Sequence, residues 1–167
     1  MEDKCKKDED SCLENFKEDY KKIQQKYGLP DFEKLNDDFQ IEKISEVETE
    51  HIIREIRKFM ADKFSNYLRF VENILQPINA PMFVFSVIKS IGVEEKNKFM
   101  EVYKFLSRKE VELIELDVEF DEDKEAKFVK EAYKEWQEIK KKILEVIDSI
   151  KSNWDNKFEV NNKGYFG

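Results

Sequence analysis

Residues 126–150 read AKFVKEAYKEWQEIKKKILEVIDSI, and this stretch decides the fold class. Apolar side chains recur along it at steps of three and four, so on an α-helix they fall within about 140° of arc. This pattern is typical of a long amphipathic helix that buries one face. We expect Asp121 or Asp123 to cap its start, and the polar residues after Lys157 to follow its end.

An N-terminal helix and another long helix are expected before this one in the chain. An N-terminal helix is expected over about residues 10–27, where one narrow apolar stripe is followed by Gly28, a residue that commonly ends helices. A longer helix is expected from about Ser45 to Pro77. Ser45 and Glu48 have the spacing of a capping box, in which each side chain accepts a hydrogen bond from a backbone N–H at the helix start.

The segments between these helices are shorter and less regular. Residues 30–44 predict a linker that packs on the core through Phe39, Ile41 and Ile44, with one short helical turn. Residues 82–91 are the most apolar stretch in the chain. They favour a short buried helix because cap and stop signals flank them, and a buried strand is the alternative for so short an apolar run.

The stretch from Glu94 to about Phe120 allows two interpretations. Residues 114–121 alternate strictly between apolar and acidic side chains, which is the pattern of a half-buried strand. On a helix, the same segment forms two apolar stripes, and Val111, Ile114 and Val118 make up a second face that needs cover. We favour the helix, since a strand there would have only residues 38–44 as a partner.

The predicted fold class is therefore all-α. We expect an elongated antiparallel bundle of three long helices, with a short apolar helix packed among them and an N-terminal helix laid across. The alternative is an α fold with a minor two-stranded element at residues 38–44 and 113–120. Such a fold fits one helical domain over residues 1–167, in which residues 1–9 and 159–167 are flexible or partner-dependent ends.

The composition supports a folded helical chain. Charged residues make up 41% of the 167 residues and hydrophobic residues 40%, with fourteen Phe but only four Gly and three Pro. Abundant Lys and Glu with few helix-breaking residues are typical of long helices whose outer faces are solvated. The apolar share is large enough to bury a core against the entropy of the chain.

The sequence also predicts where the protein works. No run of about 18 apolar residues occurs, so we expect no membrane span. Residues 1–14 are charged and lack the apolar centre of a signal peptide, which predicts a cytoplasmic protein. Cys5 and Cys12 are then expected to be reduced and incidental thiols, with a redox pair or an intermolecular disulfide as the alternative.

One short motif suggests a metal site. Glu48 and His51 form Glu-x-x-His, a spacing that places both ligands on one helix face in carboxylate-bridged di-iron bundles. Those sites use the motif on two helices, and His51 is the only histidine in the chain. A histidine-based catalytic triad and a Gly-rich phosphate loop have no candidates either. We therefore expect no metal site, no cofactor and no catalytic residues, and an enzyme has no positive support.

Residues 110–125 hold the most concentrated charge. They contain nine acids and one base, a local net charge of −8 that equals the charge of the whole chain. One interpretation is a solvated helix end followed by the cap of the next helix. The other is a docking face for a basic protein partner that is steered by charge. The candidate partner-binding residues are the second apolar face, the acids between its members and two aromatic residues near the C-terminus: Val111, Ile114, Val118, Glu115, Asp117, Glu119, Tyr165 and Phe166.

These observations lead to three hypotheses about function. We prefer a non-catalytic intracellular interaction module, acting as an adaptor, an assembly subunit or a small regulator. The alternative is a helical-bundle enzyme or carboxylate metal protein, in which Glu48, Glu50 or His51 converges with other carboxylates in a cavity. A homo-oligomer formed through the long apolar stripes is the third. Because no segment of the chain is basic, we expect no direct nucleic-acid partner.

Overall fold

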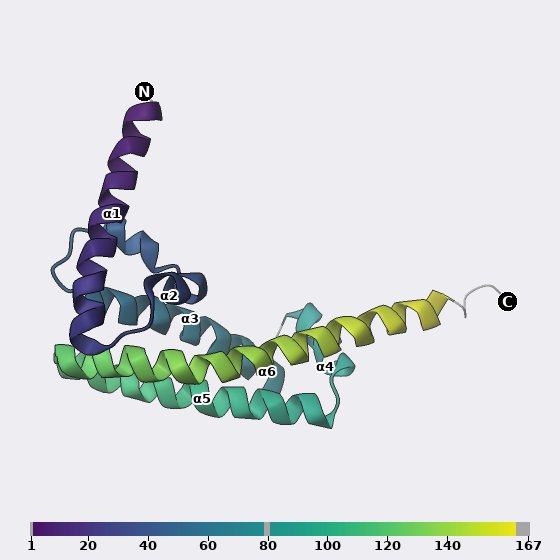
Figure 1. Cartoon of the computed structure of the whole chain (residues 1–167). Coiled ribbons are helices and arrows are strands. Elements are labelled where there is room, and N and C mark those ends of the chain that lie inside the picture. The colour runs from purple at the N-terminus through teal and green to yellow at the C-terminus, as the bar shows by residue number, and fades with distance from the viewer. Residues whose placement is uncertain (1, 79–80, 163–167) are drawn as a thin grey trace. The chain divides into compact units, whose positions relative to one another are not determined.

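The computed structural model describes the backbone of residues 2–78 and 81–162 and the side chains of residues 11–78 and 81–153. Every regular element in these ranges is helical (Figure 1). In chain order the elements are α1 (Glu2–Tyr27), α2 (Phe32–Phe39), the 3₁₀ helix η1 (Ile41–Glu46), α3 (Ile52–Leu75), α4 (Met82–Ser90), α5 (Val93–Val118) and α6 (Glu122–Asn162). The all-α fold class is confirmed, and neither 38–44 nor 113–120 contains a strand.

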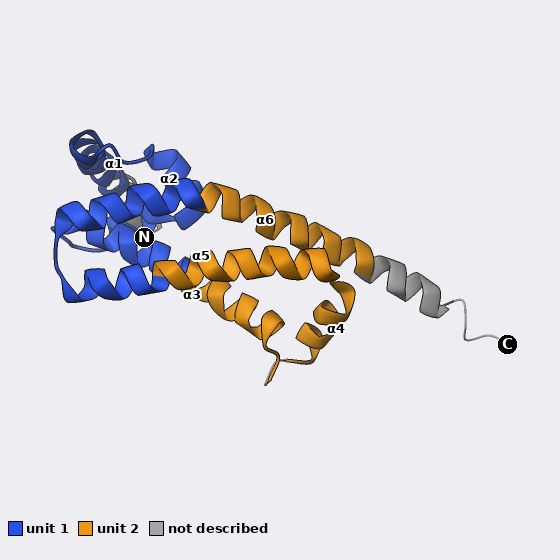
Figure 2. Ribbon diagram, turned by 90° about the horizontal axis from the view of Figure 1, so that it is seen from below, with its two compact units in different colours: residues 1–64, 110–135 blue, residues 65–109, 136–167 orange. Residues whose placement is uncertain are grey.

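The chain divides into two compact units, drawn in blue and orange in Figure 2. Unit 1 comprises residues 1–64 and 110–135, and unit 2 comprises residues 65–109 and 136–167. The helices α3, α5 and α6 each contribute one part to either unit. The helices α1 and α2 and the 3₁₀ helix η1 belong to unit 1, and α4 belongs to unit 2. The elongated bundle and the single domain over the whole chain stay predictions.

In unit 1, the stripe of α1 packs on α2 through aromatic rings. Phe16 and Tyr20 are buried, and both meet Phe32 edge to face, with ring centroids 5.8 and 5.4 Å apart. Burial raises the pKa of the Tyr20 hydroxyl, which donates a hydrogen bond to the Pro30 carbonyl. Gly28 then ends α1 in the left-handed conformation, at φ 66°, as its position in the sequence predicts.

The linker that follows is more helical than the sequence suggests. It holds α2 and η1 instead of one short turn, and Gln40, at φ 55°, separates the two. The predicted anchors are confirmed, since Phe39, Ile41 and Ile44 are all buried. The Lys63 ammonium on α3 donates to the carbonyl of Asp38, which fixes the end of α2 against the longer helix.

The start of α3 differs from the prediction. Ser45 lies within η1, where its hydroxyl donates to the Glu42 carbonyl, so the proposed capping box is wrong. The buried residues of η1 hold that segment in a 3₁₀ helix, and Val47 then takes an extended conformation that interrupts the helical path. The helix α3 begins only at Ile52. Directly before it, the His51 N–H donates a hydrogen bond to the Thr49 hydroxyl at 3.0 Å.

In unit 2, α5 and α6 run antiparallel. Lys98 pairs with Glu145 at 2.9 Å, and three residues further along α5 the Glu101 carboxylate pairs with Lys142, which comes earlier in α6. Helix α3 joins them through aromatic contacts. The rings of Tyr67 and Trp136 lie 5.5 Å apart, and those of Phe70 and Phe99 lie 6.2 Å apart.

The short apolar helix α4 is less buried than the sequence predicts. Val84 and Val87 are buried, but Met82 is 83% exposed, Phe83 54% and Phe85 40%. The described residues cover only the side of α4 that carries Val84 and Val87, so apolar residues on its other side face solvent. Across the described residues, no helix has both the length and the apolar character that crossing a bilayer requires.

Candidate functional site

The C-terminal half of α5, within unit 1, carries an exposed apolar stripe. Val111, Ile114 and Val118 are 67%, 59% and 77% exposed, and their spacing of three and four residues places them on one side of the helix. The other side of the helix carries Leu113 and Leu116, which are buried in unit 1. The stripe is therefore the outward face of a helix that is already anchored, and the cover that it needs does not come from the described residues.

The stripe leads into the connection between α5 and α6. Phe120 is 70% exposed, and the Arg54 guanidinium of α3 lies over its ring, 4.4 Å from the centroid. Of the two predicted candidates, Asp121 is the cap of α6: its carboxylate accepts from the Lys124 N–H at 3.0 Å and its carbonyl from the Glu125 N–H. Asp121 thus satisfies a backbone N–H that would otherwise lack an acceptor at the start of α6.

Several acids of the stretch 110–125 have partners within unit 1. Asp117 pairs with Arg57 at 2.7 Å, and Glu119 pairs with Lys124. Such pairs reduce the negative field below what the count of acids indicates. The hydrogen bond with Glu119 is the main reason why the pKa of Lys124 lies above its usual value, and the charge of Glu115 adds to it. Glu115 is exposed beside the apolar stripe.

The carboxylate of Glu122 also has a partner within unit 1. It accepts a hydrogen bond from the Tyr27 hydroxyl at 2.7 Å. This hydrogen bond is the main reason why the pKa of Glu122 lies below its usual value. The bond ties the end of α1 to the first turn of α6.

A buried charge network joins α3, α5 and α6 in unit 1. The side chains of Arg57 and Glu125 are 3% and 2% exposed, and Arg57 Nε lies 3.2 Å from Glu125 Oε1. Arg54 Nε approaches the same oxygen at 3.3 Å. The Nε–H of Arg57 has no hydrogen-bond acceptor, so its contact with Glu125 is an ion pair without a directed hydrogen bond.

The sequence reasoning missed this network, although a signal for it exists. Arg57 lies four residues after Ile53 and three before Met60, on the apolar stripe of its helix. Glu125 lies three residues before Phe128, again on the buried side of its helix. A charged residue at a stripe position predicts a buried partner of opposite sign, because an unpaired buried charge is costly.

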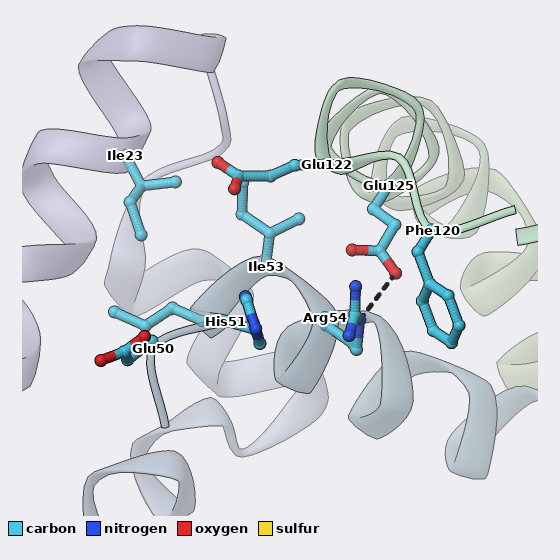
Figure 3. Close-up of a pocket in the computed structure, with 9 residues that line it drawn as sticks. Ile23, Glu50, His51, Ile53, Arg54, Phe120, Glu122 and Glu125 are labelled. Carbon is cyan, nitrogen blue, oxygen red and sulfur yellow. Dashed lines mark hydrogen bonds and ion pairs between the residues drawn. The ribbon is translucent and has the colours of Figure 1, made fainter. Parts of the chain in front are cut away.

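Next to this network lies a cavity of about 210 Å³ (Figure 3). Apolar and charged side chains share its wall: Ile23, Glu50, His51, Ile52, Ile53, Arg54, Phe120, Glu122 and Glu125. In Figure 3, Arg54 points toward Glu125, with the Phe120 ring beyond it. Phe120 therefore belongs both to the rim of the cavity and to the exposed surface beside the stripe.

The Glu-x-x-His pair does not converge in this cavity. His51 and Glu50 line it, but Glu48 is not part of its wall. Within the described ranges, no three His, Cys, Asp or Glu side chains are arranged to hold a metal ion. The helical spacing of Glu48 and His51 is lost because both lie before the first turn of α3, in non-helical backbone.

Of the two cysteines and the two C-terminal aromatic residues, the structure describes the side chain of Cys12 alone. Cys12 is an exposed free thiol, and the side chain of Cys5 lies outside the described residues. Tyr165 and Phe166 also lie outside them, so their proposed role in partner binding stays a prediction.

Comparisons with protein-family models, with curated proteins and with solved structures find no match for this chain. What bears on its function is therefore its own surface: the exposed apolar side chains, the charges around them and the adjoining cavity.

Proposed function

We propose that this chain is a non-catalytic protein–protein interaction module whose binding surface is the exposed stripe of α5. The observation that carries the proposal is the exposure of Val111, Ile114 and Val118 on a helix whose other side is buried. Complete burial of a Val or Ile side chain stabilises a complex by about 1.5–3 kcal/mol. Because these residues are 59–77% exposed, most of that gain remains for a partner.

The charges around the stripe favour a basic partner. Residues 110–118 contain four acids and no base. Asp117 is engaged with Arg57, but Glu115 faces solvent next to the stripe. A partner that offers an amphipathic helix, with an apolar stripe and basic residues at its border, would bury the valines and the isoleucine and meet the carboxylates. Attraction between opposite charges raises the rate of encounter and suppresses wrong partners.

The proposal includes an adaptor, an assembly subunit or a small regulator that works in the cytoplasm. The exposed thiol of Cys12 suits a reducing compartment. The net charge of −8 argues against a surface that follows a nucleic-acid backbone. Tyr165 and Phe166 form a second proposed contact, in which the C-terminal segment binds a partner as a short linear peptide.

The test is affinity capture followed by mass spectrometry, with the full chain as bait. An Ile114→Asp bait should lose the captured partner, because a carboxylate replaces the centre of the apolar stripe. Leu144→Asp is the matched control, since Leu144 is 51% exposed on α6 and lies outside the proposed surface. Equal capture by the wild-type and Ile114→Asp baits would contradict the proposal.

The competing hypothesis, a helical-bundle enzyme or carboxylate metal protein, rests on the cavity of unit 1. His51 and Glu50 line that cavity together with Glu122 and Glu125. Metal analysis of the purified chain and of a His51→Ala variant separates the two hypotheses. Stoichiometric metal in the wild type that is lost in the variant would favour the metal protein over the interaction module.

A further inference from the structure

The exposed side of α4 is a second apolar surface, located in unit 2. It carries Met82, Phe83 and Phe85 of α4, and Val93 at the start of α5, in the same unit, is 77% exposed. The buried side of the same helix carries Val84 and Val87, which anchor it. A hydrogen bond from the Asn153 side chain of α6 to the Ser90 carbonyl, at 2.8 Å, holds its end. The exposed residues therefore belong to a helix that is fixed in place.

This surface differs from the stripe of α5 in charge. From Gln76 to Val93 the chain contains one charged residue, Lys89, although 41% of the whole chain is charged. The stripe of α5 lies among carboxylates, with Glu115 and Glu119 exposed beside it. The two surfaces therefore suit partners of different chemistry.

We propose that the exposed side of α4, with Met82, Phe83, Phe85 and Val93, binds a second copy of this chain in a two-fold symmetric homodimer. In a two-fold interface both copies present the same patch, and residues close to the axis face their own counterparts. Between two chains that each carry −8, a region without carboxylates lowers the repulsion, and residues 76–93 hold none; the nearest in the sequence is Glu94, whose side chain is 81% exposed. Phe and Met are also enriched at interfaces, where Met adapts its shape to the opposite surface.

The area of the surface fits a weak, reversible dimer. With side chains of this size, the exposed fractions leave on the order of 500 Å² on the four residues of each chain. Two copies would then bury about 1,000 Å², which is near the lower limit for a specific interface. We therefore expect monomer and dimer to exchange, with a dissociation constant in the micromolar range.

The test is sedimentation velocity on the full-length chain, from about 1 to about 200 µM, a range that brackets a weak interface. The wild type should shift from monomer to dimer with concentration. Met82→Glu should raise the dissociation constant by about tenfold or more, because each copy would place a carboxylate in an apolar interface. Met82 is 83% exposed, so the variant should keep its fold, which circular dichroism checks.

Two control variants make the result specific. Ile114→Asp on α5 and Leu144→Glu on α6 also place a carboxylate at an exposed apolar position, and both should dimerise as the wild type does. A wild type that stays monomeric throughout would overturn the inference, and so would a Met82→Glu variant that dimerises normally. A dimer lost in Ile114→Asp but kept in Met82→Glu would assign self-association to α5 instead. Because this surface is separate from the stripe of α5, either proposal can fail while the other stands.

Discussion

Replacing Glu125 by leucine should destabilise the protein by roughly 3 kcal/mol, because Arg57 would stay buried without its buried counter-charge. The two side chains are 2% and 3% exposed, so neither can recover its hydration by a small movement. Removal of one partner from a buried ion pair costs about 3–5 kcal/mol. The lower end of this range applies here because Arg57 keeps one counter-charge. Asp117, which is largely exposed to water, still pairs with it at 2.7 Å.

The double variant Arg57→Met with Glu125→Leu should behave differently. Arg57→Met alone leaves Glu125 buried with Arg54, so it also costs about 2–4 kcal/mol. Replacing both residues by apolar side chains removes both charges and keeps the packing, which is often neutral or stabilising. The Nε–H of Arg57 already has no hydrogen-bond acceptor, so less is lost than in an ideal pair. The double variant should therefore be within about 1 kcal/mol of the wild type.

The assay is urea unfolding followed by far-ultraviolet circular dichroism, with thermal unfolding as a second readout. A loss of 3 kcal/mol lowers the melting temperature by roughly 6–12 °C in a chain of this size. Glu138→Leu is the matched control, since it removes a surface pair with Lys141 that is worth less than about 1 kcal/mol. The reasoning is refuted if Glu125→Leu costs less than about 1 kcal/mol, or if the double variant is as destabilised as the sum of the single ones.

Three further predictions each concern one residue. Gly28→Ala should cost about 1 kcal/mol in urea unfolding, because a Cβ at φ 66° is strained; an equal or higher stability would contradict the role of this turn. Tyr27→Phe should raise the pKa of Glu122, measured by NMR titration of its carboxyl carbon, because the Tyr27 hydroxyl is the main cause that lowers it. A lowered folded pKa gives stability that is present above the unfolded pKa and lost as pH falls through the folded one, so the variant should also depend less on pH in that interval. Ile114→Asp should change the free energy of unfolding by no more than about 0.5 kcal/mol, since the residue is exposed; a larger loss would mean that the stripe supports the fold.

The sequence by itself determined the helices and several of their ends. The period of the apolar residues predicts α1, α3, α5 and α6, because a helix that buries one face must repeat its apolar side chains every three or four positions. Gly28 ends α1 as predicted, and Asp121, one of the two predicted caps, begins α6, because their effects are local to the backbone. The outward direction of Ile114 also follows from the helical period, once the strand alternative is set aside.

The tertiary structure alone decided what each face meets. Ser45 and Glu48 have the spacing of a capping box, but Ser45 lies within the 3₁₀ helix η1, whose apolar residues are buried. The helix α3 therefore begins seven residues later, at Ile52. The apolar run of α4 reads as buried, yet Met82 faces solvent because the unit covers only one side of the helix. Several acids of the stretch 110–125 pair with bases that are distant in the chain, as Glu125 does with Arg57. Such pairings depend on which segments the fold brings together, and periodicity along one helix carries no information about its neighbours.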